Sequence, residues 1–513
     1  MSVLAWTIYC SFLGAGILLL VPRNNAGLAR RLALIAALAG LVCGLIGATH
    51  IEPGAIQTIA RVPWIPSLGI EYYLAADGIS ATLVVLTGLA AVAGILFSWN
   101  IEERVPEFFA FYLALIGGVY GVFLSFDAFL LFVFYEIAII PKYFIIAIWG
   151  STRREYGAMK LALYSFVGSA MVLIVLIAAF VLSGAKSMSL LELAKFPFPH
   201  SFQMWAFPLA FVGFGILAGL WPFHTWAPTG HVAAPTAASM LLAGVVMKLG
   251  AYGCLRVAMT VFPEGLDPWG WKVLGLGSWR DFMSVLAVVG IVYGALVALV
   301  QSDFKFVIGY SSVSHMGFVL LGLMTLNRIG LSGSVLQMFS HGIIAGLLFA
   351  VVGRMVYDRT HTRELAQLGE MNLSKALPFA AATFTIASMA SMGLPGFSGF
   401  VAELQVIIGT WESYPSLAIV TGLGILIGVA YTLRVLQKAF FADHETALVV
   451  AAAGNGGGHD PELKPITIPE RIGAALLIVA SLVIGLYPRL LLDLIGPSFN
   501  SALFDALRKR GSF

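Results

Sequence analysis

The chain has 513 residues, 59% of them hydrophobic and only 11% charged, with a net charge of +3. Soluble domains carry roughly a quarter charged residues, so this composition excludes an ordinary soluble globule and predicts a polytopic membrane protein. A charge this small, without a basic run containing interleaved aromatic residues, argues against a nucleic-acid partner. The expected surroundings are the lipid bilayer.

The N-terminal stretch MSVLAWTIYCSFLGAGILLLVPRNN is expected to be an uncleaved first helix. Its apolar run starts at once and Arg23 follows it, whereas a cleaved signal begins with a basic region. The absence of a transit peptide favours a bacterial inner (plasma) membrane.

Apolar segments long enough to cross about 30 Å of hydrocarbon number fourteen. They fall near residues 3–22, 32–50, 76–98, 108–125, 127–149, 158–183, 207–222, 235–260, 282–302, 306–326, 332–356, 376–412, 416–441 and 470–494. An even number puts both termini on one side. The loops PRNNAGLARR, STRRE and YDRTHTRELAQLGEMNLSK are basic and follow odd-numbered spans, which predicts cytoplasmic loops and outward termini, although the tail ALRKRGSF favours the opposite orientation.

Two of these segments are interrupted by helix-breaking residues. Pro222, Pro228 and Pro235 break the seventh, and Pro395 with its flanking glycines breaks the twelfth. Broken helices at corresponding places in two halves indicate an inverted-repeat transporter with its site at the membrane midplane. Unrelated kinks are the alternative. The glycine-rich stretch within 444–465 is expected to be a surface loop.

Ionisable residues within the spans are few, and each costs about 2.5–3.5 kcal/mol at mid-bilayer. They are Glu136 and Lys142 in the fifth span, Lys248, His315, His341 and Glu403, with His224, His231 and Lys305 near span ends or breaks. Singly, each is compatible with a salt bridge or a snorkelling side chain, and Lys305 is expected to be one, beside Asp303. Together, the series favours a proton relay, because imidazole titrates near neutrality.

The cysteines give no sign of a redox centre in this chain. Cys10, Cys43 and Cys254 are isolated, no C-x-x-C spacing occurs, and no nucleotide-binding glycine motif is present. Neither a metal site nor a bound cofactor is therefore expected in this chain.

Five stretches together resemble the antiporter-like M subunit of respiratory complex I. They are YEIAIIPKYFIIAIWG, PFHTWAPTGHVAAPTAASMLLAGVVMKLGAYGCLR, DFKFVIGYSSVSHMGFVLLG, HGIIAGLLFAVVGRM and GLPGFSGFVAEL, in the order of that family and within about residues 108–441. The resemblance implies an all-α polytopic membrane protein of about 14 transmembrane helices, with two inverted five-helix repeats and broken helices 7 and 12. It implies four segments: N-terminal helices 1–3 (1–107), a first repeat (108–262), a second repeat (282–441), and a loop with helix 14 (442–513).

The resemblance also implies a function: a proton-translocating membrane-arm subunit of an NADH:quinone oxidoreductase, without a redox site of its own. The relay residues implied by the motifs are Glu136, Lys248, His315, His341 and Glu403. Flavin mononucleotide (FMN), iron–sulfur clusters, NADH and quinone would be bound by other subunits. The implied partners are neighbouring membrane-arm subunits of the L and N types.

Three departures from the family pattern stand out. Where the family has a lysine in helix 7, five residues before Pro222, this chain has Leu217. Thr229 replaces the usual aspartate, and Lys142 stands where an apolar residue is commoner. Six helical steps place Lys142 about 120° around the helix from Glu136 and about 9 Å along it, so a direct pair is not expected. Either Lys142 or a residue from a neighbouring chain supplies the missing cation, and the alternative for Lys142 is that it snorkels to the cytoplasmic end.

Several alternatives remain open at this point. The chain could be a subunit of a related membrane-bound hydrogenase or of an Mrp-type cation/proton antiporter. It could be a weakly pumping variant, because Leu217 replaces the lysine, or a structural spacer between pump modules. Retained transport is the favoured interpretation.

Overall fold

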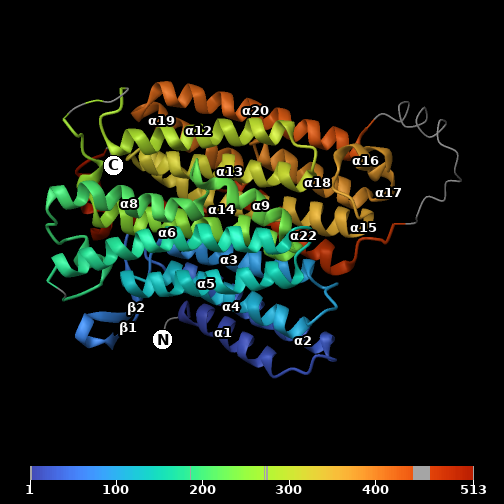
Figure 1. Ribbon diagram of the computed structural model, residues 1–513, viewed down its shortest axis with the longest axis horizontal. Coiled ribbons are helices and arrows are strands. Elements are labelled where there is room, and N and C mark those ends of the chain that lie inside the picture. The colour runs from blue at the N-terminus through green and yellow to red at the C-terminus, as the bar shows by residue number, and fades with distance from the viewer. Residues whose placement is uncertain (1–2, 185, 271, 273–274, 443–462, 512–513) are drawn as a thin grey trace, which may run out of the picture.

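The computed structural model describes residues 3–184, 186–270, 272, 275–442 and 463–511, and long helices run side by side along its length (Figure 1). The first half contains helices α1 (Ala5–Leu19), α2 (Ala26–Thr49), α3 (Gly78–Phe97), α4 (Val105–Leu124), α5 (Ala128–Trp149), α6 (Arg154–Leu182), α7 (Leu190–Leu193), α8 (His200–Ala218), η2 (Phe223–Thr225), α9 (Trp226–Ala233), α10 (Thr236–Leu241), η3 (Leu242–Val246), α11 (Met247–Gly253), η4 (Cys254–Met259) and η5 (Pro263–Leu266).

The second half contains helices α12 (Trp279–Val300), α13 (Phe304–Met324), α14 (Arg328–Ala350), η6 (Val351–Tyr357), α15 (Asp358–Thr360), α16 (Leu365–Glu370), α17 (Leu373–Ala376), α18 (Pro378–Ser391), α19 (Ser398–Ser413), α20 (Pro415–Phe440), α22 (Ile468–Leu486), α23 (Arg489–Ser498), η7 (Ala502–Phe504) and α24 (Asp505–Arg508). The expected loop within 444–465 falls almost wholly outside the described residues.

The predicted helical membrane fold is confirmed. Among the described residues, twelve helices are long and apolar enough to cross a membrane, or thirteen if the bent pair near the C-terminus is one span. Every predicted segment coincides with helix, but α1 has only 15 residues and the segment 376–412 divides into α18 and α19. The count of fourteen spans therefore stays a prediction.

One element was not predicted, so the all-α description is incomplete. Strands β1 (Gln57–Ile65) and β2 (Ile70–Ala76) form an antiparallel hairpin around a short helical turn, η1 (Pro66–Leu68). Gly69 ends that turn with φ +59°, a conformation that glycine adopts without strain. The hairpin lies before the third span, in a region (51–75) too rich in polar residues, proline and glycine to read as a membrane helix.

An aspartate starts three of the central spans. Asp127 accepts hydrogen bonds from the backbone N–H groups of Phe129 and Leu130 at 3.0 and 2.9 Å, and Asp77 and Asp303 cap α3 and α13 in the same way. Such caps satisfy N–H groups that have no partner within the helix. They fix where each span begins.

Both predicted interruptions are confirmed. Helix α8 ends at Gly219, with φ +83°, and the chain resumes as the short helices η2 and α9. Between α18 and α19, Gly393 and Gly396 have φ +72° and +102°. The chain therefore leaves regular helix at two places, one in each half.

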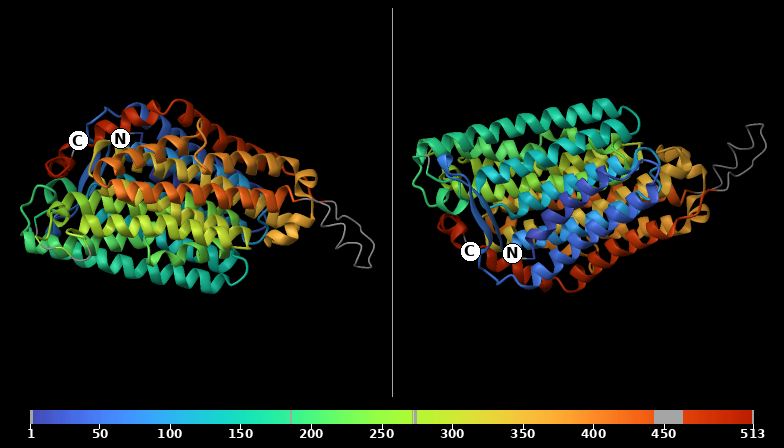
Figure 2. Two further views of the ribbon diagram at one scale, coloured as in Figure 1. Left: turned by 90° about the horizontal axis from the view of Figure 1, so that it is seen from above. Right: turned by 90° about the horizontal axis from the view of Figure 1, so that it is seen from below.

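The helix that carries Lys248 is wound irregularly. π-helical turns η3 and η4 flank α11 on both sides, and such turns occur frequently at functional sites. Both termini lie at one end of the bundle (Figure 2), as an even number of spans requires.

Candidate functional site

Lys248 lies at the centre of the bundle and contacts a histidine from the other half of the chain. Its side chain is fully buried. The Nζ atom donates to the carbonyl oxygen of Ala243 and lies 2.9 Å from Nδ1 of His341 on α14. A lysine and an imidazole that share a hydrogen bond can exchange a proton across it.

The line of contacts continues from His341 to an acidic residue. The rings of His341 and His315 stack with centroids 5.4 Å apart and planes 26° apart. Nδ1 of His315 lies 3.0 Å from Oε1 of Glu403. Four of the five predicted relay residues, from α11, α14, α13 and α19, therefore lie in one line, which we call the central line.

Two residues that the sequence did not single out complete the acidic end of the central line. Nε2 of Gln337 donates to Oε1 of Glu403 at 3.3 Å and lies 3.4 Å from Nδ1 of His315. Oγ of Ser391, at the end of α18, lies 3.3 Å from Nε2 of His315. Gln337 stands four residues before His341, and this spacing, which puts both on one face of α14, is the signal that could have found it.

A small cavity borders the acidic end of the central line. It has a volume of about 10 Å³, and residues lining it include His315, Ser391, Glu403 and Tyr431. Tyr431 in turn shares a 2.7 Å hydrogen bond with Ser311. The volume is at the lower limit for one water molecule.

Glu136 is not part of the central line among the described residues. It lies half-buried on α5 and accepts a hydrogen bond from Oγ of Ser169 on α6. Helix α8 stands between it and Lys248: Phe214 packs edge-on against Tyr135 of α5, with ring centroids 5.6 Å apart, while Ala218 lies against Gly250 of α11. The structure thus places Glu136, the fifth predicted relay residue, away from the central line. We call Glu136 and Ser169 the second cluster.

Lys142 is buried next to this second cluster, so the snorkelling interpretation is wrong. Its exposed fraction is 1%, and Nζ donates to Oγ of Ser165 on α6 at 3.4 Å. The side chain turns toward α6 instead of reaching the membrane surface. Leu217, where the resemblance implied a lysine, is buried on α8 with 1% exposure.

Lys305 is not the surface ion pair that the sequence suggested. It is 3% exposed, and Nζ donates to the carbonyl oxygen of Ala234, just past the C-terminal end of α9, at 2.7 Å. Asp303 instead caps α13 and pairs with Arg363 at 3.3 Å. A cation at this position stabilises the negative end of the helix dipole.

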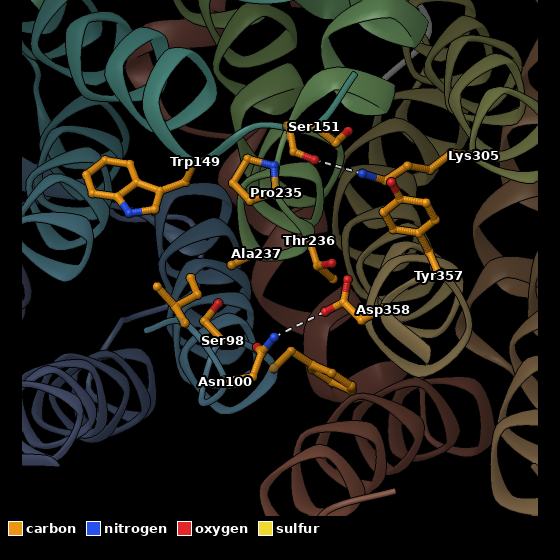
Figure 3. Close-up of a pocket in the computed structure, with 13 residues that line it drawn as sticks. Ser98, Asn100, Trp149, Ser151, Pro235, Thr236, Ala237, Lys305, Tyr357 and Asp358 are labelled. Atoms are coloured by element: carbon orange, nitrogen blue, oxygen red, sulfur yellow. Dashed lines mark hydrogen bonds between the residues drawn. The ribbon is translucent and has the colours of Figure 1, made fainter. Parts of the chain in front are cut away.

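Lys305 also lines a cavity of about 270 Å³ (Figure 3). Asp358 of α15 lies on its wall, and α15 is at the end of the bundle opposite the termini (Figure 1). Polar groups on its wall include Asn100, which donates to Asp358 at 3.2 Å. His231 lies close enough to both Lys305 and Lys248 for electrostatic interaction, and its ring packs on Phe349 with centroids 4.8 Å apart. Lys305 thus lies on the wall of this cavity, and His231 interacts electrostatically both with it and with Lys248 of the central line.

His224, the last of the ionisable residues predicted near span ends or breaks, lies apart from Lys305, His231 and the central line. Its ring contacts Tyr293 of α12 edge-on, with centroids 5.2 Å apart. Thr229, where the resemblance implied an aspartate, accepts a hydrogen bond from Nζ of Lys160 at 3.3 Å. The Thr229 hydroxyl therefore accepts the hydrogen bond of Lys160 at a position where a carboxylate was expected.

Comparison with known proteins places this arrangement in a family. Residues 125–428 match the model described as "NADH:quinone oxidoreductase/Mrp antiporter, TM", and this range contains the central line and both helix breaks. The chain belongs to this family. It is 35% identical over 503 residues to NADH-quinone oxidoreductase subunit M of Rhodobacter capsulatus, covering 94% of this chain and 93% of the relative.

Other relatives agree with this assignment. The chain is 37% identical to NAD(P)H-quinone oxidoreductase chain 4 1 of a Synechococcus strain, covering 85% of this chain and 80% of the relative. It superposes on a chain of respiratory complex I from Thermus thermophilus with a TM-score of 0.84 and 28% identity, covering 98% and 100% of the two chains. A chain of the Mrp complex from Dietzia sp. has the same fold, with a TM-score of 0.82, 21% identity, and coverage of 98% and 97%.

The predicted resemblance to the M subunit of complex I is confirmed by these relatives. The chain is a multi-pass membrane protein with the antiporter-like fold of that subunit family. Because the relatives at 35–37% identity are quinone oxidoreductase subunits, the Mrp-type alternative has less support.

Proposed function

We propose that this chain is the proton-translocating M-type subunit in the membrane arm of a complex I-type NADH:quinone oxidoreductase. One observation carries the proposal: Lys248, His341, His315 and Glu403 form the central line, in which four ionisable side chains from four helices meet in the membrane interior. Intramembrane ionisable residues of this kind are the usual components of proton relays.

Each step along the central line follows from the chemistry of its groups. Lys248 and His341 share a hydrogen bond that a proton can cross, and His315 and Glu403 share another. The imidazoles stack, so a proton passes between them through a water molecule or by rotation of a ring. Gln337 and Ser391 hold His315 in position for the step to Glu403.

We further propose that protons enter from the cavity beside Lys305 and pass His231 on their way to Lys248. The cavity lies at the end of the bundle that carries the basic loops, which the positive-inside rule assigns to the cytoplasm. In this orientation both termini face outward, across a bacterial inner membrane. The helix breaks after α8 and α18 then mark corresponding positions in two five-helix repeats, 108–262 and 282–441.

Redox chemistry belongs to other subunits in this proposal. The sequence of this chain contains no C-x-x-C motif and no nucleotide-binding glycine motif, so NADH, FMN, iron–sulfur clusters and quinone would be bound elsewhere. The neighbouring L- and N-type subunits are the proposed direct partners. This chain contributes the path for protons.

The test compares proton translocation with electron transfer in membrane vesicles that contain the assembled complex. Lys248→Met is expected to lower the ratio of protons pumped to electrons transferred, because removing a proton-transfer group costs about 10²–10⁴-fold in that step. The exposed Lys195→Met is the control and should keep the wild-type ratio. An unchanged ratio in Lys248→Met, with normal assembly, would instead favour the structural-spacer alternative.

A further inference from the structure

Lys142 is a buried lysine that the central line does not use. It is 1% exposed in the interior of α5, where an ammonium group costs several kcal/mol unless other groups compensate. Nζ donates a hydrogen bond to a neutral hydroxyl, that of Ser165. A nearby acidic group would offset the cost of burying the ammonium group.

The acidic group is Glu136, and α6 connects the two. Ser165 and Ser169 stand four residues apart, on one face of α6. Ser165 accepts from Nζ of Lys142, and Ser169 donates to Oε1 of Glu136. The two serines, one turn apart on α6, therefore contact a base and an acid that lie almost two turns apart on α5.

This arrangement brings Lys142 and Glu136 close enough to interact electrostatically with each other. Helix α8, which carries the apolar Leu217, contains no lysine or arginine, and its one histidine, His200, pairs with Glu264 at the far end of the helix. Lys142, next to the second cluster, is thus the lysine that interacts with Glu136.

We propose that Lys142, held by Ser165, is the positioning residue that sets the charge state of Glu136 and thereby makes Glu136 part of proton transfer. This inference rests on the proposed function and adds to it a specific role for α6. In this role Lys142 supplies the positive charge that a lysine at position 217 in helix 7 would otherwise supply. Ser165 positions Lys142 and Ser169 positions Glu136.

The experiment uses the assembled complex in membrane vesicles and measures the proton-to-electron ratio as a function of pH. Lys142→Met is expected to lower the ratio at neutral pH. It should also move the pH profile by about one unit or more to higher pH, because a carboxyl without a nearby cation ionises at higher pH. Lys142→Arg should preserve both.

The matched control is Lys160→Met. Lys160 also donates to a hydroxyl at 3.3 Å, but to Thr229 and not toward Glu136, so its removal should leave the ratio and the pH profile unchanged. If Lys142→Met behaves like Lys160→Met while Lys248→Met lowers the ratio, this inference is overturned and the proposed function stands. If Lys248→Met has no effect either, the proposed function itself fails.

Two further variants keep the test decisive. Should Lys142→Met not assemble, Ser165→Ala is expected to move the pH profile in the same direction by a smaller amount, and an unmoved profile overturns the proposal. The double variant Lys142→Met/Leu217→Lys is expected to regain the ratio lost in Lys142→Met. If it assembles but pumps no better than Lys142→Met, positions 142 and 217 are not equivalent and the substitution of one cation for the other is overturned.

Discussion

Nζ of Lys248 lies 2.9 Å from Nδ1 of His341, although 93 residues separate them in the chain. Because two positive charges are not stable in such a contact in a low-dielectric interior, at least one partner of the pair is neutral. The hydrogen bond therefore holds a proton that either residue can carry. The contact joins the two halves of the chain at the point where the central line begins.

Gln337→Leu is expected to slow proton translocation without preventing assembly. It removes the donor that lies 3.3 Å from Oε1 of Glu403, and a hydrogen bond to a charged group is worth about 1.5–3 kcal/mol. At 1.36 kcal/mol for each factor of ten, translocation at fixed electron transfer should fall about tenfold or more. The ratio of protons to electrons in vesicles measures this.

Gln437→Leu on the exposed side of α20 serves as the control for Gln337→Leu. It makes the same change of side chain away from the central line and should leave the ratio at its wild-type value. Equal ratios in both variants would show that Gln337 does not orient Glu403.

Arg256→Met is expected to destabilise the fold by about 3–5 kcal/mol. Arg256 and Asp77 are both fully buried and form an ion pair of 2.5 Å, so the substitution leaves Asp77 charged and unpaired. Asp77→Asn together with Arg256→Met removes both charges while the amide can still cap α3, and it should recover most of the loss. Thermal unfolding of the purified complex compares the two variants, and a double variant no more stable than Arg256→Met would contradict this account.

Asp127, at the start of α5, makes stability depend on pH. Burial raises its pKa from 3.8 to about 6, against three backbone N–H groups that stabilise the charged form. A raised pKa means that its contribution is fully present below pH 3.8 and is lost as pH rises through about 6. Asp127→Asn, which stays neutral, should therefore gain stability over the wild type between these values, by about 3 kcal/mol at the top of the window.

Thermal unfolding of Asp127→Asn and of the wild type, measured from pH 4 to pH 7, tests this expectation. The difference between them should grow up to about pH 6 and then level off. Glu71, whose backbone N–H donates to Asp127 at 3.1 Å, is unchanged in both proteins. A difference that does not vary with pH would mean that Asp127 is not the group responsible.

The sequence predicted the helical fold and most of the central line because both leave local signals. Apolar runs of about 20 residues mark the spans, and an isolated charge such as Lys248 stands out within them. Proline and glycine marked both helix breaks. These features depend on neighbouring residues alone.

The features that were missed depend on packing between distant segments. Serines such as Ser165 and Ser169 are common in membrane helices, and only the close approach of α5 and α6 gives them a role. The separation of Glu136 from Lys248 likewise follows from where α8 packs. The burial of Lys142 and Lys305 was missed because snorkelling depends on which helices cover the side chain.

The central claim is that Lys248 and Glu403 lie on one proton path, and the proton-to-electron ratio of a double variant tests it most directly. Lys248→Met, Glu403→Gln and the variant carrying both are compared in the assembled complex, at equal rates of electron transfer. For groups in one line the second substitution adds no further loss, so the double variant should match the more severe single variant. A double variant whose loss equals the sum of the two single losses would contradict the account, because the two residues would then act on separate paths.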